Sequence, residues 1–396
     1  MAATDQVLGS EDSRGSLLYN PVVRGVFFQI LVFGGLCAFL YWIVHNTQEN
    51  LARAGRNVSF DFLYQRAGFD VGQSLIQYSS DSTQLDALIV GLLNTLLVAA
   101  AGIVTATIIG FVVGIGRLSR NWLIRKFCQV YVETFRNIPP LLVIFFWYLG
   151  VLAILPGPRD SFKLPFGSLL SNRGLFVPKP VWEEGSWLVG VAFLIAIAMG
   201  FFVARKASAR QAATGQRFPV FWTNVALIVG LPLLALAAAG FPLSFSIPKL
   251  GAFQATGGLA IGPEFLALYL ALSLYTASFI AEIVRAGILG VSKGQTEAAY
   301  ALGLRPGATT RLVIVPQAMR IIVPPLTSQY LNLTKNSSLA IAVGYADLVS
   351  IGGTILNKSG ESIQIVAIWM VVYLSISLAT SLFMNWFNSR VALVER

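Results

Sequence analysis

The chain has 396 residues, of which 56% are hydrophobic and only 12% are charged. Soluble domains carry about 25% charged residues, so this composition excludes a soluble fold with an ordinary water-exposed surface. The net charge of +10 does not indicate nucleic-acid binding, because the basic residues lie in short clusters between long apolar blocks. We therefore predict an all-α polytopic membrane protein.

Eight apolar blocks are long enough to cross a bilayer as helices, which takes about 20 residues each. They cover 22–44, 87–116, 139–155, 187–204, 219–240, 262–286, 311–333 and 364–388. The third block is short, and a start near Val130 remains open. The seventh block contains Pro316, Pro324 and Pro325, which interrupt helical hydrogen bonding. The first block is too long for the apolar part of a cleavable signal, so we predict a retained span.

The distribution of Lys and Arg between the blocks predicts the orientation. Segments on the side of the two termini carry 16 of these residues and segments on the other side carry 10. The richer segments are also the shorter ones, and short basic loops stay in the cytoplasm. Both termini are therefore predicted to be cytoplasmic. The loops 45–86 and 156–186, together with the Gly-, Pro- and Ser-rich stretch 241–261, then face outside.

The sequence offers no constellation for bond chemistry. The single histidine, His45, has no partner residues, and Cys37 and Cys128 lack the spacing of metal ligands. Gly352 to Ser359 resembles a phosphate-binding loop, but Asn357 occupies a position that requires glycine. We therefore predict no catalytic residue, no metal site and no cofactor in this chain, which is not expected to be an enzyme.

A short helix is predicted between the sixth and seventh blocks. Ser292 and Gln295 have the spacing of a capping box, and the residues from Thr296 to Leu302 are mostly strong helix formers. Gly303 and Pro306 then form a stop signal. A helix of about ten residues is roughly 15 Å long and cannot cross a bilayer. Such a short helix needs a packing partner to stay folded, so we predict that another molecule packs on it at the cytoplasmic side.

The same segment resembles the EAA signature of ABC importer permeases. Glu297-Ala298-Ala299 is followed by Gly303 and then, after nine intervening residues, by Val313-Ile314-Val315-Pro316. The family pattern usually ends in I-x-L-P, so Val313 and Val315 are mild departures from it. In that family, the short helix docks in a groove of a cytoplasmic ATPase subunit.

Further stretches are similar to the polar amino acid (HisMQ-like) branch of these permeases. They are Gly91-Leu92-Leu93-Asn94-Thr95-Leu96, Tyr131-Val132-Glu133-Thr134-Phe135-Arg136-Asn137-Ile138-Pro139-Pro140, Ala281-Glu282-Ile283-Val284-Arg285-Ala286-Gly287 and Lys335-Asn336-Ser337-Ser338-Leu339. They occur in the family order over roughly 86–390. Members commonly have about five spans, so the blocks at 187–204 and 219–240 resemble an insertion, as in the larger permeases of general L-amino acid transporters.

The resemblance implies a type I ABC importer transmembrane fold with an inserted helix pair. Residues 1–85 would hold the cytoplasmic amino terminus, the first transmembrane helix and a periplasmic loop. Residues 86–390 would form the transmembrane domain, with the insertion at about 156–261 and the coupling loop at about 288–311. The implied location is the bacterial inner membrane, which the chain crosses several times.

The implied function is the import of amino acids by alternating access, driven by ATP bound to a partner subunit. The expected partners are a cytoplasmic ABC ATPase dimer, a second homologous permease subunit, a periplasmic amino-acid-binding protein and the lipid bilayer, without nucleic acid. In the short helix, Glu297 would contact the ATPase by charge or hydrogen bonding. Ala298 and Ala299 would permit close approach, and Gly303 would set the turn.

Ionisable groups inside apolar spans are costly and are therefore candidates for a substrate path. Glu282 and Arg285 have the i,i+3 spacing of an ion pair, and Arg320 could meet a carboxylate or Glu282. For these three residues a structural pairing is a slightly favoured alternative. Lys335, Asn336, Ser337 and Ser338 follow the seventh block near its expected outer end. They could line the path or cap the helix, and the sequence favours neither.

Two other functions compete with the importer. An ion-coupled secondary amino acid transporter needs no partner ATPase and would leave the short helix without a role. A membrane enzyme or channel subunit would require a catalytic cluster or a filter motif, and we find neither in the sequence.

Overall fold

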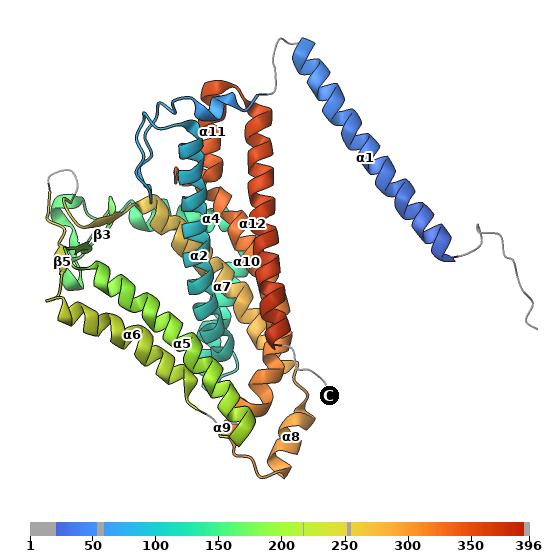
Figure 1. Ribbon diagram of the computed structural model, residues 1–396, viewed down its shortest axis with the longest axis vertical. Coiled ribbons are helices and arrows are strands. Elements are labelled where there is room, and N and C mark those ends of the chain that lie inside the picture. The colour runs from blue at the N-terminus through green and yellow to red at the C-terminus, as the bar shows by residue number, and fades with distance from the viewer. Residues whose placement is uncertain (1–20, 54–58, 217, 252–254, 392–396) are drawn as a thin grey trace, which may run out of the picture.

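The computed structural model describes residues 21–53, 59–216, 218–251 and 255–391 (Figure 1). Its longer helices are α1 (Pro21–Arg53), α2 (Gln84–Gly116), α3 (Trp122–Asn137), α5 (Trp187–Thr214), α6 (Val220–Ala238), α7 (Pro263–Leu289), α10 (Val315–Asn336) and α12 (Ser362–Val391). Its shorter helices are α4 (Pro140–Phe145), α8 (Lys293–Ala301), α9 (Pro306–Thr309) and α11 (Leu348–Ser359). Residues 1–20, predicted to be cytoplasmic, lie outside the described part of the chain.

The described helices confirm the prediction of about eight spans. Six helices are long and apolar enough to cross a membrane, and two bent helix pairs bring the number to as many as eight. The first pair joins 122–137 to 140–152 at an angle of 111°, and the second joins 306–343 to 348–359 at 50°. The first bend lies at Ile138 and Pro139, which are both extended, as expected for residues that precede a proline. The short third block is therefore the second limb of a broken helix.

The second bend corrects the predicted end of the seventh span. The block was expected to end at residue 333, but the helical chain continues through a 3-10 segment, Ser337–Val343, and then through α11. Buried polar groups hold the bend: Asn94 Nδ2 donates to the carbonyl of Ala346 at 2.9 Å, and the N–H of Leu348 donates to the hydroxyl of Thr95 at 3.1 Å. These bonds satisfy backbone groups that the break in the helix leaves free, as a membrane interior requires.

The core of the bundle is the packing of α2 against α7, shown side by side in Figure 1. Small residues recur every fourth position along the buried face of α2, at Gly102, Ala106, Gly110 and Gly114. A Cβ atom at Gly110 would lie 2.5 Å from the Cγ2 atom of Ile280. Small residues at this spacing let two membrane helices approach closely, so this seam fixes α2 to α7.

We expect Gly110→Ala to destabilise the bundle by about 1–3 kcal/mol, because the added methyl group forces the close α2–α7 pair apart. The matched control is Gly230→Ala in α6, where nothing lies within 4 Å of the added Cβ atom. Thermal unfolding of the two purified variants in detergent measures the difference. Equal melting temperatures for the two variants would contradict the close packing of α2 against α7 at Gly110.

The predicted outer loops contain two small antiparallel sheets that the sequence did not indicate. One sheet has the order β1 (Phe162–Lys163), β2 (Leu169–Ser171), β3 (Gly174–Val177) and β6 (Leu259–Ile261), and the other pairs β4 (Lys179–Trp182) with β5 (Leu243–Ser246). Both β3–β6 and β4–β5 join the chain before the α5–α6 hairpin to the chain after it. These pairings close the inserted segment at its base.

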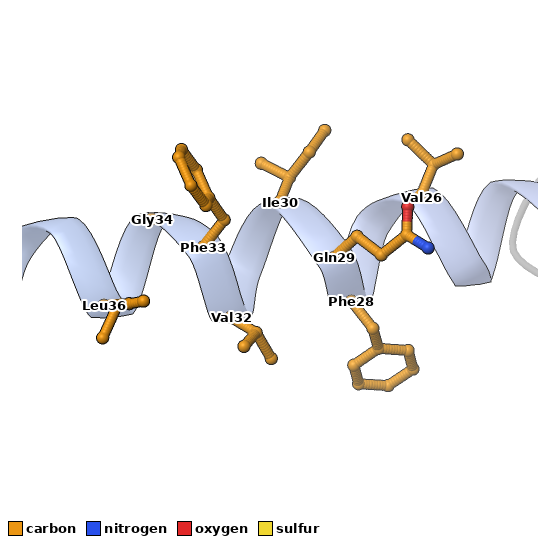
Figure 2. Close-up of a pocket in the computed structure, with 8 residues that line it drawn as sticks. All are labelled: Val26, Phe28, Gln29, Ile30, Val32, Phe33, Gly34 and Leu36. Atoms are coloured by element: carbon orange, nitrogen blue, oxygen red, sulfur yellow. The ribbon is translucent and has the colours of Figure 1, made fainter. Parts of the chain in front are cut away.

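Helix α1 stands apart from the bundle in Figure 1, and its most apolar stretch has no buried residue. Figure 2 shows that its apolar side chains point to opposite sides, with Val26 and Ile30 on one side and Phe28 and Val32 on the other. A helix that is apolar all round is suited to a membrane span. The close-up therefore shows a shallow surface of a single helix and no enclosed site.

The segment Gly352 to Ser359, whose sequence resembles a phosphate-binding loop, has a structural role. Residues 352–359 are helical and belong to α11, whereas a phosphate-binding loop requires an irregular glycine-rich turn after a strand. The ammonium group of Lys358 donates to the carbonyl oxygens of Ala67 and Gly68, at 2.8 and 2.9 Å. Lys358 thus ties the loop that precedes α2 to α11.

Candidate functional site

Helix α8 lies at one end of the bundle, beyond the last turn of α7 (Figure 1). The predicted helix is present, but the predicted capping box is wrong, because the side chain of Ser292 makes no capping hydrogen bond. The N–H of Gln295 instead donates to the backbone carbonyl of Ser292 at 3.0 Å. The side chain of Gln295 accepts a hydrogen bond from Gln317 of α10 at 3.1 Å, so it anchors α8 to the bundle.

Gly303 ends α8 in the left-handed conformation, with φ of +76°. The N–H of Gly303 donates to Tyr300 at 2.9 Å, and the N–H of Leu304 donates to Ala299 at 3.1 Å. This pair of bonds is a Schellman motif, which favours glycine at its left-handed position. The stop signal in the sequence therefore corresponds to a defined turn.

One side of α8 is exposed and the other is packed. Glu297 and Ala298 are exposed, and so are the apolar side chains of Tyr300 and Leu302, at 49% and 81%. Ala299 is only 3% exposed, so it packs within this chain and does not offer a contact surface. Sequence reasoning missed Tyr300 and Leu302, although apolar residues at the end of a loop helix were a signal for a covered face.

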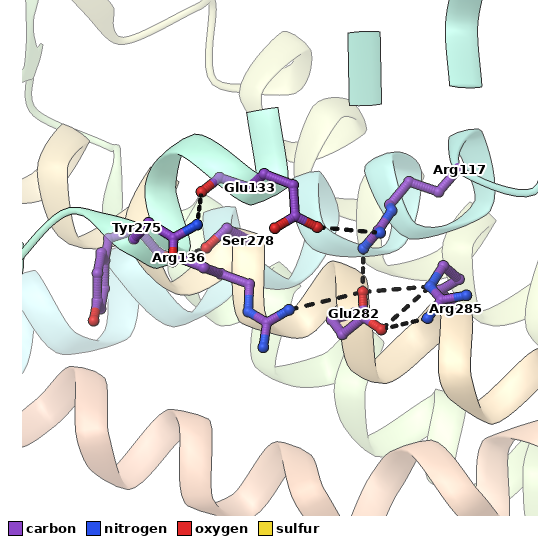
Figure 3. A network of polar contacts seen from close by, with 8 residues as sticks. Arg117, Glu133, Arg136, Tyr275, Ser278, Glu282 and Arg285 are labelled. Carbon is purple, nitrogen blue, oxygen red and sulfur yellow. Dashed lines mark hydrogen bonds and ion pairs between the residues drawn. The ribbon is translucent and has the colours of Figure 1, made fainter. Parts of the chain in front are cut away.

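A cluster of charges lies at the same end of the bundle and centres on Glu282 of α7 (Figure 3). Arg285 donates to Glu282 at 2.6 Å, which confirms the pairing expected from the i,i+3 spacing. Arg117, at the end of α2, donates to the other carboxylate oxygen, and Arg136 of α3 lies 4.0 Å from it. Three helices thus meet at one carboxylate.

Glu133 of α3 completes the cluster, with a carboxylate oxygen 3.8 Å from the Arg117 guanidinium. The side chain of Arg117 is only 10% exposed and that of Glu282 is 25% exposed. Charges with little access to water are costly unless they are paired. The ion pairs of this cluster therefore hold the ends of α2, α3 and α7 together. The sequence did not single out Arg117, because 165 residues separate it from Glu282.

Arg320 does not reach Glu282. The described residues give Glu282 three arginine neighbours, and Arg320 is not among them. The Nε and Nη2 atoms of Arg320 are buried without a hydrogen-bond partner in the described part of the chain. Of the two partners that the sequence allowed for Arg320, Glu282 is therefore not the one, because other arginines occupy its carboxylate.

Lys335, Asn336, Ser337 and Ser338 lie deeper than predicted. Leu333 packs against Gly102, because a Cβ atom added at Gly102 would lie only 3.2 Å from the Leu333 side chain, and Gly102 is close to the middle of α2. Residues 335–338 are thus near the middle of the bundle, and the expected position at an outer end is wrong because the span continues into α11. The serines bond to their own helix: Ser337 to Thr334 at 2.7 Å and Ser338 to Lys335 at 2.8 Å.

An exposed polar stripe runs along α10 through this middle region. Ser328, Asn332 and Lys335 are all exposed, and their spacing of four and three residues places them on one face of the helix. Lys335 makes no ion pair with the described residues. A polar face at this depth of a membrane bundle is suited to a water-filled path or to a partner subunit, and not to lipid.

No three His, Cys, Asp or Glu side chains come together as possible metal ligands within the described ranges. The arrangement therefore offers contact surfaces and charge pairs. The exposed side of α8 faces away from the bundle, the charge cluster connects the helix ends behind it, and the polar stripe of α10 lies between the two ends.

The chain is similar to known proteins along almost its whole length. The family described as "Binding-protein-dependent transport system inner membrane component" matches residues 102–393. The chain is 64% identical to the general L-amino acid transport system permease protein AapQ of Rhizobium johnstonii, over 99% of this chain and 98% of that protein. It is 49% identical to the putative amino-acid ABC transporter permease protein YhdX of Escherichia coli, over 97% and 98% of the two chains. It is 45% identical to the glutamate/glutamine/aspartate/asparagine transport system permease protein BztB of Rhodobacter capsulatus, over 96% of each.

Proposed function

The chain belongs to the family of binding-protein-dependent transport system inner membrane components, and on this premise we propose that it is the permease subunit of an ATP-driven importer of amino acids. Relatives that cover almost the whole chain carry amino-acid permease names. Membership of a binding-protein-dependent transport system argues against the ion-coupled alternative, and so does the ABC transporter permease name of a relative that covers almost the whole chain.

The observation that carries the proposal is the exposed side of α8. Glu297, Tyr300 and Leu302 are exposed on a helix whose other side packs through Ala299 and is anchored through Gln295. An exposed cluster of apolar groups with a carboxylate at its edge fits a protein partner. In an ATP-driven importer, that partner would be the cytoplasmic ATPase dimer, which binds and hydrolyses the nucleotide.

The contacts behind α8 supply a route for coupling. The helix follows α7 after a short turn, and α7 holds α2 and α3 through the charge cluster. Closure of the ATPase dimer would move α8, and these paired helices would move with it to alternate access to the path. Coupling residues are then Glu297, Ala298 and Gly303 at the contact, with Ala299 holding the helix in place.

The exposed stripe on α10 supports a substrate path. Lys335 presents a positive charge at the middle of the bundle, where it can attract the carboxylate of a passing amino acid. A second, homologous permease subunit facing this stripe would enclose the path. A periplasmic binding protein would deliver the amino acid to the opposite end from α8, and both termini would be cytoplasmic.

The experiment that tests the function is uptake by the complete complex in proteoliposomes. We expect amino acids to accumulate only when ATP and a ligand-loaded binding protein are both supplied. Accumulation driven by an ion gradient without ATP would contradict the proposal. Loss of the ATPase from the purified complex on Leu302→Asp substitution, with the chain still in the membrane, would place the contact on α8.

We expect Lys335→Ala to lower uptake at least about tenfold, because the path loses its charge at mid-depth, while Lys335→Arg retains most of the activity. The matched control is Lys249→Ala, since Lys249 lies in the loop between β5 and β6. Initial rates of uptake by the complex in proteoliposomes measure the effect. Equal uptake rates for Lys335→Ala and Lys249→Ala would show that Lys335 does not contribute to the substrate path.

A further inference from the structure

A polar pocket of about 690 Å³ opens at the end of the bundle opposite α8. Gln73, from the loop before α2, lines it, as do Tyr148 of the π-helical segment Phe146–Leu152 and residues 344–346 of the bend. The turn between β2 and β3 contributes Asn172 and Arg173, and the first turn of α7 contributes Glu264. Pockets for small molecules measure about 300–1,000 Å³, so the volume suits an amino acid.

The pocket holds two opposite charges that do not neutralise each other. No ion pair within 4 Å joins Arg173 to Glu264 or to any other described carboxylate. The only hydrogen bond that the described residues give to the Glu264 side chain comes from the Tyr148 hydroxyl and is long, at 3.4 Å. Both charges therefore keep hydrogen-bonding capacity for a ligand that lies between them.

Two amide oxygens in the same lining also lack a donor. The Oε1 atom of Gln73 and the Oδ1 atom of Asn172 are buried and make no hydrogen bond in the described part of the chain. Buried acceptors without a donor are costly. An ammonium group donates up to three hydrogen bonds, so it is the kind of ligand group that these acceptors and Glu264 favour.

We propose that this pocket is an outer subsite for the zwitterionic head of an amino acid, with Arg173 on the carboxylate and Glu264, Gln73 and Asn172 around the ammonium group. The subsite rests on the proposed function, since it receives the amino acid before the path through the bundle. Asn172 and Arg173 belong to the predicted insertion, 156–261, so the inserted sheet contributes directly to ligand binding. Residues 344–346, at the bend before α11, form another wall.

The test measures binding of L-alanine and L-glutamate to the purified complete complex without its binding protein, by isothermal titration. Ethylamine and propionate serve as forms of alanine that lack the carboxylate and the ammonium group. We expect both amino acids to bind and both fragments to bind at least about tenfold more weakly, because each loses one set of charge-assisted hydrogen bonds. Fragments that bind as well as alanine overturn the assignment to a zwitterion.

Arg173→Gln and Glu264→Gln are each expected to weaken amino acid binding at least about tenfold. The matched controls are Arg159→Gln and Asp160→Asn, which change exposed charges of the same inserted segment outside the pocket. Wild-type affinity in both pocket variants, or no binding by the wild-type complex, overturns the subsite. ATP-driven uptake by the wild-type complex is measured in parallel, and its absence would contradict the proposed function instead.

Discussion

Glu282→Gln should destabilise the bundle by on the order of 3 kcal/mol, because it leaves Arg117, Arg136 and Arg285 facing one another without their shared carboxylate. The loss of the carboxylate is most costly at Arg117, because its side chain is only 10% exposed and the nearest remaining carboxylate, that of Glu133, lies 3.8 Å away. Thermal unfolding of the detergent-solubilised complex measures the loss, which should reach several degrees.

The matched control for this cluster is Glu133→Gln. The Glu133 side chain is 53% exposed and meets Arg117 only at the edge of ion-pair distance, so its removal should cost less than about 1 kcal/mol. A double variant, Arg117→Gln with Glu282→Gln, should recover part of the stability lost by Glu282→Gln alone, because the least exposed guanidinium is no longer uncompensated. Additive losses in the double variant would show that the two groups act independently.

Gly303→Val should uncouple ATP hydrolysis from transport. The position has φ of +76°, a conformation that costs a β-branched residue more than the 1–2 kcal/mol estimated for ordinary residues. The turn that ends α8 would rearrange, and the exposed side chains of Tyr300 and Leu302 would lose their fixed orientation. We expect uptake, and the stimulation of ATPase activity by a loaded binding protein, to fall on the order of tenfold.

Two controls separate strain from simple bulk at this turn. Gly303→Asn should keep most of the activity, because asparagine tolerates the left-handed region. Gly307→Val adds the same bulk in α9, where the backbone is not left-handed and nothing lies within 4 Å of the added Cβ atom. Full coupling in Gly303→Val, or equal loss in Gly307→Val, would argue against a role for the turn.

Much of the fold follows from local sequence signals. Hydropathy indicated the six helices that are long and apolar enough to cross a membrane by themselves, because bilayer-crossing helices need long apolar runs. Gly303 and Pro306 indicated the end of α8, and the i,i+3 spacing indicated the Glu282–Arg285 pair. These features depend on residues close together in the chain, which is why periodicity and stop signals predicted them.

The features that were missed depend on distant contacts or on the position of a break. Arg117 and Glu282 meet only because α2 and α7 pack along the small-residue seam. The depth of Lys335 was wrong because hydropathy ended the span at residue 333, whereas backbone groups at the bend are satisfied by Asn94 and Thr95 of α2. The pairing of β3 with β6 across the inserted hairpin likewise has no local signal.

Helix α7 connects the two ends of the molecule as a single rod. It begins at Pro263, next to Glu264 of the outer pocket, and ends just before α8, and its 27 residues span about 40 Å. A lever of this length that pivots near one end by roughly 5° displaces the other end by about 3–4 Å, which exceeds the length of a hydrogen bond. A small movement of α8, caused by the proposed ATPase partner, would therefore suffice to break the hydrogen bonds between the outer pocket and a bound amino acid.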